Sequence, residues 1–293
     1  MKTPLHILMT GANGFLGSYL LKAFLQQGYK LTVIKRDASD LWRIKDFADR
    51  VTFYDVEDLA EAFDNNSVDV VVHTACHYGR NGDSVSQIVE TNLNFSLKLL
   101  ELAVANKVPT FVNTDSLLPR ELNVYALSKK QFVDWLAFYQ QKIQVINLKL
   151  EHMYGPLDDS KKFVSWIIEQ FAQNVEKIDL TKGEQLRDFV YIDDIVLAFC
   201  LVINVHSQLD RYSEFDVGSG QLTSVRHFVE QLKMSYQKYC DNGIKTELNF
   251  GAIDYRQGEL MSVDVDIEPL RSLGWNPVVD LESGLEKLIK ENK

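Results

Sequence analysis

The sequence predicts an α/β fold in which a doubly wound parallel sheet is followed by a smaller, mixed α/β domain. In the first half of the chain, short apolar segments alternate with helix-like segments. These apolar segments lack a polar face, as expected for strands that helices cover on both sides. After Pro156 the regular alternation gives way to a mixed pattern. Together these observations predict a nucleotide-binding type of sheet at the start of the chain and a second domain after it.

The predicted sheet is built from six apolar segments. They are Leu5–Thr10, Lys30–Lys35, Val51–Val56, Val68–Ala75, Pro109–Thr114 and Gln144–Leu150. The segments between them include patterns with apolar residues at helical spacing, as crossover helices require. We therefore expect a first domain over residues 1–155 and a substrate domain over residues 156–293. Segments near residues 188–220 are expected to return to the first domain.

Composition excludes several classes of protein. The chain has 293 residues, 46% of them hydrophobic, and a net charge of −10 without a basic cluster, so we expect no nucleic-acid partner. The longest apolar run, Ile195–Val205, is too short to cross a membrane. The three cysteines lie far apart and form neither a disulfide framework nor a metal-ligand pattern. A reducing, cytoplasmic setting and no metal are the expectations.

A glycine-rich turn follows the first predicted strand and opens the first helix. In "TGANGFLGSYL", Gly11, Gly14 and Gly17 allow a tight turn and the close approach of a pyrophosphate. The helix N-terminus then offers free N–H groups to the phosphates. The strand–turn–helix context predicts a dinucleotide site of the Rossmann type. The other residues that we expect in this cofactor loop are Asn13, Phe15 and Leu16.

A tyrosine stands four residues before a lysine in "NVYALSKKQF", which the apolar spacing predicts to be a helix. Residues i and i+4 are neighbours on one side of a helix, so the Tyr125 phenol lies beside the Lys129 ammonium. Taken alone, the pair is equally compatible with a surface lysine next to a half-buried tyrosine. Its interpretation depends on the other motifs.

The turn "TGANGFLG" resembles that of the extended short-chain dehydrogenase/reductase family, many of whose members act on nucleotide sugars. The family's catalytic Tyr-x-x-x-Lys pair matches "YALSK", and its Ser or Thr at the end of the preceding strand matches Thr114. The resemblance implies that Tyr125 exchanges a proton with the substrate, Thr114 binds the same substrate oxygen and Lys129 holds the nicotinamide ribose. We also expect the Lys129 ammonium to lower the pKa of Tyr125, since an opposite charge favours the phenolate.

The end of the second predicted strand, "VIKRD", predicts the cofactor. Lys35 or Arg36 stands where NAD-binding sheets carry an acid for the ribose 2′-hydroxyl. Basic groups suit a 2′-phosphate, which favours NADP (as NADPH) over NAD. The alternative is that both are solvated and Asp37 binds the ribose. By resemblance, the other residues expected at the cofactor are Asp55, Val56, Thr74 and Ala75.

Three residues in the second half are expected at a nucleotide-diphosphate sugar. "GEQLRDFVYIDDIV" and "DYRQGEL" are similar to family segments in which Arg187 and Arg256 would contact the diphosphate. His152, before "MYGP", occupies a position at which many members have an asparagine near the diphosphate. Two arginines that converge on one diphosphate would give an acidic protein a local anion site.

Departures from the family pattern narrow the expected chemistry. Sugar-nucleotide 4,6-dehydratases carry Thr-Asp-Glu where this chain has Thr114-Asp115-Ser116, so the acid pair for elimination is incomplete. The segment between Thr114 and Tyr125 is also short. The motifs "NTDSLL", "VYALSKKQF", "LEHMYGP" and "RDFVYIDD" are most similar to the CDP-abequose and CDP-paratose synthases, which reduce a CDP-4-keto-3,6-dideoxyhexose for O-antigen sugars.

The predicted function is therefore NADPH-dependent reduction of a nucleotide-linked 4-keto-deoxyhexose. One alternative is a 4-epimerase that retains NAD and uses the same Thr–Tyr–Lys set in both directions. Another is a regulator that binds NADP without catalysis, although such a protein has no need of a proton donor. The base, the sugar and the C4 configuration stay open. Dimers are frequent in the family, which makes a homodimer the expected assembly.

Overall fold

The structure is a computed structural model that describes residues 4–80, 82–240 and 243–291. The chain forms two compact units. The first comprises the chain up to Leu150 together with Val196–Asp216, and the second comprises Glu151–Ile195 and Val217 onward. Each unit is therefore assembled from segments that are distant in sequence.

The first unit contains a seven-stranded sheet with the order β10-β6-β5-β4-β1-β2-β3. Its strands are β1 (His6–Thr10), β2 (Lys30–Lys35), β3 (Thr52–Asp55), β4 (Val70–His73), β5 (Thr110–Ser116), β6 (Gln144–Leu150) and β10 (Tyr212–Val217). The pairs that join β1 to β6 are all parallel. The order 3-2-1-4-5-6 reverses between β1 and β4, and ligands of such sheets bind at that switch point, beyond the carboxyl ends of the strands.

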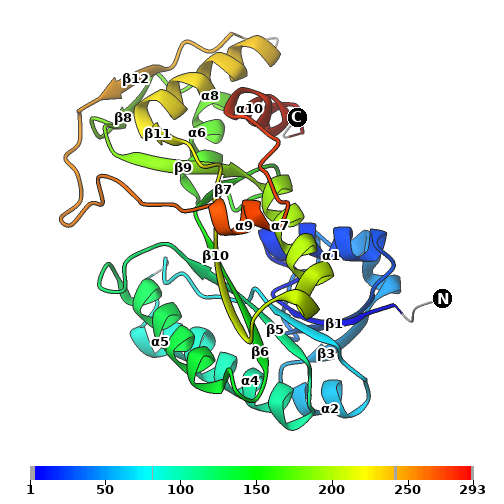
Figure 1. Ribbon diagram of the computed structural model, residues 1–293. Helices are drawn as coiled ribbons and strands as arrows, with labels where there is room; N and C mark the ends of the chain where they lie inside the picture. The colour runs from blue at the N-terminus through cyan, green and yellow to red at the C-terminus, as the bar shows by residue number, and fades with distance from the viewer. Residues whose placement is uncertain (1–3, 81, 241–242, 292–293) are drawn as a thin grey trace. The chain divides into compact units, whose positions relative to one another are not determined.

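Helices cover both faces of this sheet. They are α1 (Phe15–Gln26), η1 (Lys45–Arg50), α2 (Leu59–Asp64), α3 (Val85–Val89), the π-helix η2 (Glu90–Phe95), α4 (Ser96–Ala105), α5 (Val124–Tyr139), α7 (Ile192–Val205) and η3 (His206–Gln208). Helices α1 and α7 lie side by side on one face (Figure 1), where the Tyr29 hydroxyl donates to Asn204 at 2.6 Å. Helices α2, α4 and α5 pack on the other face.

The predicted fold class is confirmed. Strands β2 and β6 have the predicted bounds, and the other four differ from prediction by at most two residues at either end. The main local irregularity is the π-helical segment η2 between α3 and α4. A π turn inserts one extra residue into a helix, so the apolar positions after it are shifted by one residue relative to the 3.6-residue spacing.

The core of the first unit lies between the sheet and helices α2, α4 and α5. Leu8, Val71, Phe111 and Val145 from four strands are fully buried against these helices. Each fully buried aliphatic or aromatic side chain contributes about 1.5–3 kcal/mol relative to exposure. This packing holds the carboxyl ends of the strands in a fixed arrangement.

The second unit is a mixed α/β structure. Its strands are β7 (His152–Tyr154), β8 (Lys177–Leu180), β9 (Leu186–Tyr191), β11 (Leu222–Ser224) and β12 (Glu247–Phe250), and its helices are α6 (Phe163–Ala172), α8 (Val225–Tyr239), α9 (Glu268–Ser272) and α10 (Leu281–Glu291). Strands β11, β9 and β7 form one sheet, and β12 pairs with β8. Mixed strand directions within a small sheet explain the loss of the βαβ pattern after Pro156.

Aromatic packing and one buried carboxylate hold the second unit together. Phe189 stacks on Phe228 with ring centroids 3.8 Å apart, and Tyr154 contacts Phe228 edge-on at 5.5 Å. Asp194 accepts hydrogen bonds from the backbone N–H groups of Val278 and Val279 at 2.9 and 3.1 Å. The motifs "YIDD" and "LGWNPVV" are thus joined directly, which gives both a structural role.

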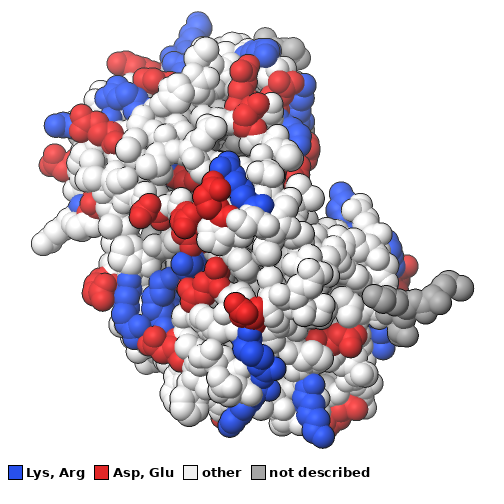
Figure 2. Space-filling model, in the orientation of Figure 1, with Lys and Arg blue, Asp and Glu red and all other residues white. Residues whose placement is uncertain are grey.

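The surface carries mixed charge. On the face shown in Figure 2, basic and acidic side chains are interspersed and no continuous basic area is visible among the residues coloured. Within the described ranges, no helix combines the length and the apolar character needed to cross a bilayer.

Candidate active site

The N-terminus of α5 presents the predicted catalytic pair. The Asn123 side chain caps this helix by accepting a hydrogen bond from the Ala126 N–H at 2.8 Å. The cap places Tyr125 in the first turn and Lys129 one turn later. Lys129 is only 2% exposed and Tyr125 is partly buried. Both side chains lie within electrostatic reach of Cys76 and Asp115, so the structure brings them together at the carboxyl edge of the sheet.

The expectation that the Lys129 ammonium lowers the pKa of Tyr125 is wrong for the chain on its own. Burial raises the pKa of Tyr125 well above its ordinary value, and Cys76 and Asp115 raise that pKa further. The cation that opposes them is Arg80 rather than Lys129. Burial also lowers the pKa of the Lys129 ammonium. The sequence argument considered only the neighbouring charge, whereas removal of both groups from water is the larger effect.

A segment after β4 covers the phenol. The rings of Tyr78 and Tyr125 lie 4.9 Å apart with an interplanar angle of 30°. The Arg80 guanidinium carbon lies over the Tyr78 ring, 4.7 Å from its centroid. Gly79 has φ +68°, and a Cβ there would meet the Ile88 side chain at 2.4 Å. The stack of Arg80, Tyr78 and Tyr125 is therefore held by a glycine that no other residue type could replace without strain.

The end of β5 places polar atoms next to this pair. The Thr114 hydroxyl is buried, and no partner within the described ranges hydrogen-bonds to it. The same holds for Asp115 Oδ1 and the Ser116 hydroxyl. Buried polar atoms are normally paired, so an unpaired one at a sheet's carboxyl edge indicates a place for a ligand. Thr114 thus has the free hydroxyl that its predicted role requires.

The other oxygen of Asp115 is tied to α5. Lys130 Nζ donates to Asp115 Oδ2 at 2.5 Å and to the Ser116 carbonyl at 2.5 Å. The Asp115 side chain is 1% exposed and that of Lys130 21%. Across β5 and β6, Asp115 pairs in register with Lys149, whose ammonium lies 2.8 Å from Asp216 of β10. Charges of alternating sign therefore cross the end of the sheet.

The glycine turn forms a close-packed cradle at the start of α1. Gly11 has φ +72°, and a Cβ there would lie 2.6 Å from the Ala75 N–H nitrogen. A Cβ on Gly17 would overlap the Gly11 carbonyl oxygen. Helix α1 has no side-chain cap, so its first N–H groups stay available to an anion. These features fit a dinucleotide, and Gly11 lies next to Thr74 and Ala75, two other residues expected at the cofactor.

The ends of β2 and β3 bring together the residues expected at the adenosine ribose. Lys35 pairs in register with Asp55, and the Val56 N–H donates to the Lys35 carbonyl at 2.9 Å. Asp55 Oδ2 is buried, with no partner in the part of the chain that the structure describes. Arg36 is exposed in the turn that follows β2.

A further basic residue at this end was missed by sequence reasoning. Arg43 Nη1 donates to the carbonyl of Asn13, in the glycine turn, at 3.3 Å. The Asn13 side chain in turn donates to the Asp40 carbonyl at 3.2 Å. Arg43 lies seven residues beyond Arg36, so only the folding of this loop back onto the turn reveals its position.

The three residues expected at the substrate belong to the second unit. Arg187, on β9, is 8% exposed, and its guanidinium donates to Glu259 at 2.6 Å and to the Leu260 carbonyl at 2.7 Å. Arg256 is exposed, and its carbonyl accepts from the Glu259 N–H at 3.0 Å in the same turn. His152, on the neighbouring β7, is exposed, and its Nδ1 lies 2.7 Å from Glu151. The structure thus groups the three around β9 and β7.

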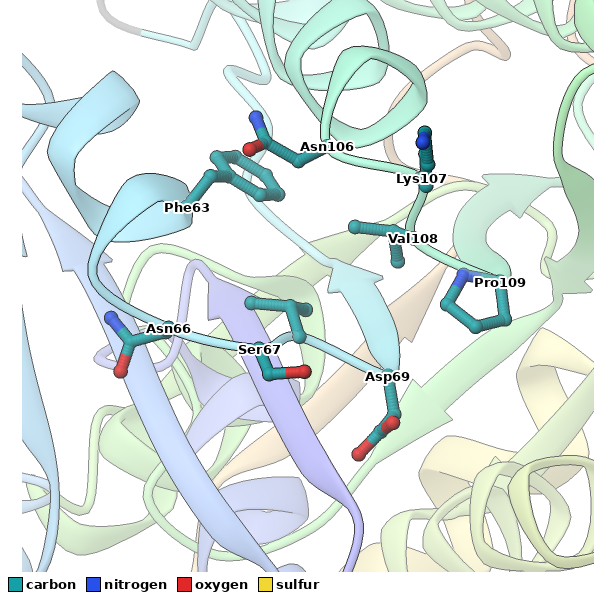
Figure 3. A pocket seen from close by; sticks show the side chains of 9 residues that line it. Phe63, Asn66, Ser67, Asp69, Asn106, Lys107, Val108 and Pro109 are labelled. Atoms are coloured by element: carbon teal, nitrogen blue, oxygen red, sulfur yellow. The ribbon is translucent and has the colours of Figure 1, made fainter.

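A pocket in the first unit lies at the opposite edge of its sheet (Figure 3). It is formed where the chain enters β4 and β5, and Asn66, Asp69, Asn106 and Lys107 line it. Asp69 is engaged with the backbone, since it accepts from the His6 N–H at 2.8 Å. The pocket is at the amino ends of the strands and contains none of the predicted site residues.

Comparison with known proteins agrees with this geometry. Residues 7–218 match the NAD dependent epimerase/dehydratase family. The chain belongs to this family. It is 30% identical to the CDP-abequose synthases of Salmonella typhimurium, over 97% of both chains, and of Salmonella muenchen, over 97% of this chain and 96% of that one. The resemblance to the extended short-chain dehydrogenase/reductases is thereby confirmed.

A solved structure shows the same fold. The UDP-glucuronic acid 4-epimerase of Bacillus cereus, in complex with UDP-glucuronic acid and NAD, superposes with a TM-score of 0.85. The match covers 98% of each chain at 23% identity. At this identity the similarity speaks for the architecture of the family and not for a substrate.

Within this family fold, sequence reasoning missed a buried asparagine that organises the site. Asn92, in the π-helical segment, donates to the Ser128 hydroxyl at 3.0 Å and to the His77 carbonyl at 2.9 Å. Its own Oδ1 accepts from the His77 N–H at 2.7 Å. One side chain therefore joins α5 to the segment that carries Tyr78. No spacing in the sequence marks it, because its partners are far away along the chain.

Proposed function

We propose that this protein reduces a nucleotide-linked 4-keto-deoxyhexose to the 4-hydroxy sugar with NADPH, and that a CDP-4-keto-3,6-dideoxyhexose is its substrate. The observation that carries the proposal is the 30% identity to CDP-abequose synthases over nearly the whole of both chains. A Thr–Tyr–Lys set at the carboxyl edge of the sheet supports it, with the Thr114 hydroxyl and Lys129 buried and Tyr125 partly buried, since this set is suited to proton transfer at a carbonyl.

The chain's own residues have distinct parts in the proposed reaction. When bound, the reduced nicotinamide supplies the hydride. Thr114 holds the substrate oxygen through its unpaired hydroxyl. Tyr125 donates its proton to that oxygen as the ketone becomes an alcohol, and the phenolate later regains a proton from solvent. Lys129 binds the cofactor ribose, and the Arg80 guanidinium favours the phenolate that remains.

The residues proposed to bind the cofactor are those of the glycine cradle and of the β2 and β3 ends. Gly11, Gly14 and Gly17 bring backbone N–H groups to the pyrophosphate. Lys35 and Arg36 are proposed to select the 2′-phosphate of NADPH. Arg43, next to Asn13, adds a third basic group at this end. The density of positive charge here is the reason for proposing NADPH over NADH.

The substrate diphosphate is proposed to bind Arg187 and Arg256, with His152 nearby. Arg187 is held by Glu259, so the diphosphate would take the place of a carboxylate that already pairs with this arginine. The exposed Arg256 forms no ion pair in the described part of the chain, so it can approach the same anion without breaking one. A bidentate contact of this kind is typical of arginine and phosphate.

The test is a substrate panel followed by NADPH absorbance. CDP-, TDP- and UDP-linked 4-keto-6-deoxy and 4-keto-3,6-dideoxy sugars are supplied with NADPH, and the product configuration at C4 is read by NMR. We expect consumption of NADPH in proportion to product, fastest with the CDP-linked dideoxy sugar. Interconversion of 4-hydroxy sugars without added NADPH would instead indicate an epimerase. Binding of NADP without turnover of any sugar would indicate a regulator.

A further inference from the structure

Lys130 has no part in the proposed reaction, yet it makes the closest ion pair beside the catalytic residues. Its ammonium contacts a carboxylate whose side chain is 1% exposed. A carboxylate this deeply buried requires a compensating cation or it takes up a proton. Lys130 also donates to the Ser116 carbonyl, so its position is fixed by two acceptors from the end of β5. The pair is a built feature of the site.

The carboxylate lies at the end of β5 directly after Thr114, and its partner Lys130 follows Lys129 on α5. Asp115 raises the pKa of Tyr125, which means that its negative charge opposes formation of the phenolate. It also raises the pKa of Lys129. Proton donation from Tyr125 leaves a second negative charge close to Asp115. In a buried setting the repulsion between two such charges is weakly screened, so a cation on Asp115 changes the cost of forming the phenolate.

We propose that Lys130 is a positioning residue for proton transfer at Tyr125, acting by neutralising the Asp115 carboxylate that would otherwise oppose the phenolate. The inference rests on the proposed function. In that reaction the Tyr125 O–H bond breaks and the alcohol O–H bond forms while the carbonyl carbon accepts a hydride. The phenolate left behind is the species that an unpaired Asp115 would destabilise.

Several charged or titratable groups lie around the Lys130–Asp115 pair and the Tyr125 phenol, and the variants must leave these groups unchanged. They come from the segment after β4, from β6, from β10 and from α5. These groups are Cys76, Arg80, Lys129, Lys149, Tyr212 and Asp216. Within the described ranges none of them forms a side-chain hydrogen bond with Asp115, whereas Lys130 does.

The decisive experiment is a double-mutant cycle on turnover of the holoenzyme with its keto sugar. Lys130→Met removes the cation and should lower kcat roughly three- to tenfold, a part of what general acid catalysis supplies. Asp115→Asn removes the opposing charge and provides the reference level of kcat for the cycle. The double variant Asp115→Asn/Lys130→Met should recover to the level of Asp115→Asn, because the lysine then has no charge to neutralise.

A control and a pH arm separate this role from loss of packing. Lys233→Met removes a lysine on α8 of the second unit, whose ammonium donates to the Thr246 carbonyl at 2.7 Å. This variant should leave kcat unchanged. In Lys130→Met the unpaired Asp115 should take up a proton as the pH falls. The deficit in kcat should therefore be larger at about pH 8.5 than at about pH 6. A purely structural defect would be independent of pH and would persist in the double variant.

Each outcome decides the proposal. Unchanged kcat in Lys130→Met, or a double variant as slow as Lys130→Met, overturns it. If Lys130→Met does not fold, the comparison of Asp115→Asn with the double variant suffices, since any further loss shows that Lys130 acts by another route.

If the wild type reduces no keto sugar, the proposed function has failed on its own. The Tyr125 phenol is then titrated by NMR of ¹³Cζ-tyrosine, with Tyr125→Phe to assign the signal. A midpoint in Lys130→Met no higher than in wild type overturns the inference.

Discussion

The two units each contain a partly buried ion pair at or beside their predicted functional residues, and the pairs differ in what surrounds them. In the first unit, Lys130 and Asp115 meet at 2.5 Å between a strand end and a helix. In the second unit, Arg187 and Glu259 meet at 2.6 Å. Glu259 comes from a long segment without regular structure, residues 251–266, and its side chain is 23% exposed. One acid is locked in place by the fold, whereas the other is held by a loop.

The Lys130–Asp115 and Arg187–Glu259 pairs are therefore suited to different tasks. Asp115 keeps a buried oxygen without a partner in the described part of the chain, so its pair shapes the electrostatic surroundings of Tyr125. Arg187 donates to the Leu260 carbonyl and to Glu259, and it is proposed to exchange Glu259 for a diphosphate. A fixed charge pair tunes a reacting group, while an exchangeable pair binds an anion.

The largest expected effect is at the proton donor of the first unit. Tyr125→Phe removes one hydroxyl and keeps the ring that packs on Tyr78. Fold and cofactor affinity should therefore be nearly unchanged, while kcat falls by about 10²-fold or more, the scale of general acid catalysis. Steady-state kinetics with saturating NADPH and keto sugar provide the measurement. Turnover close to that of the wild type would rule out Tyr125 as the proton donor.

A second, smaller effect is expected at the exchangeable pair. Arg187→Ala should raise the substrate KM roughly ten- to a hundredfold with little change in the NADPH KM, since a charged hydrogen bond contributes about 1.5–3 kcal/mol. Arg256→Ala should act in the same direction. Glu259→Gln provides the matched contrast: it removes the competing anion and should lower the substrate KM. A rise in NADPH KM alone in either arginine variant would place that arginine outside the substrate site.

The smallest effect is expected on the preference for NADPH over NADH. Replacing Lys35 and Arg36 together by Ala should weaken NADPH and leave NADH almost untouched, because only NADPH carries the 2′-phosphate. The NADPH/NADH preference should fall by roughly tenfold. Titration of both cofactors by fluorescence, at low and high salt, measures it. A wild type that prefers NADH would mean that the ribose is bound by Asp37 or a neighbour.

Much of the fold followed from local sequence. The unbroken apolar character of segments such as Lys30–Lys35 and Gln144–Leu150 predicted buried parallel strands with the observed bounds. Gly11 and Gly17 predicted a turn in which no Cβ fits, and the structure places backbone atoms where a Cβ would lie. The spacing of Tyr125 and Lys129 predicted one face of one helix. These features depend on periods of two and 3.6 residues and on backbone geometry, which short segments encode by themselves.

The surroundings of those residues were decided by tertiary structure. Asn92, Tyr78 and Arg80 meet Tyr125 or its helix only because β4, the π-helical segment and α5 converge at one edge of the sheet. The pKa of Tyr125 is raised because the fold removes the phenol from water, an effect that no residue spacing reveals. Sequence alone thus determined which groups could react. Burial and long-range contacts, which depend on how distant segments pack, decided the electrostatic field in which they lie.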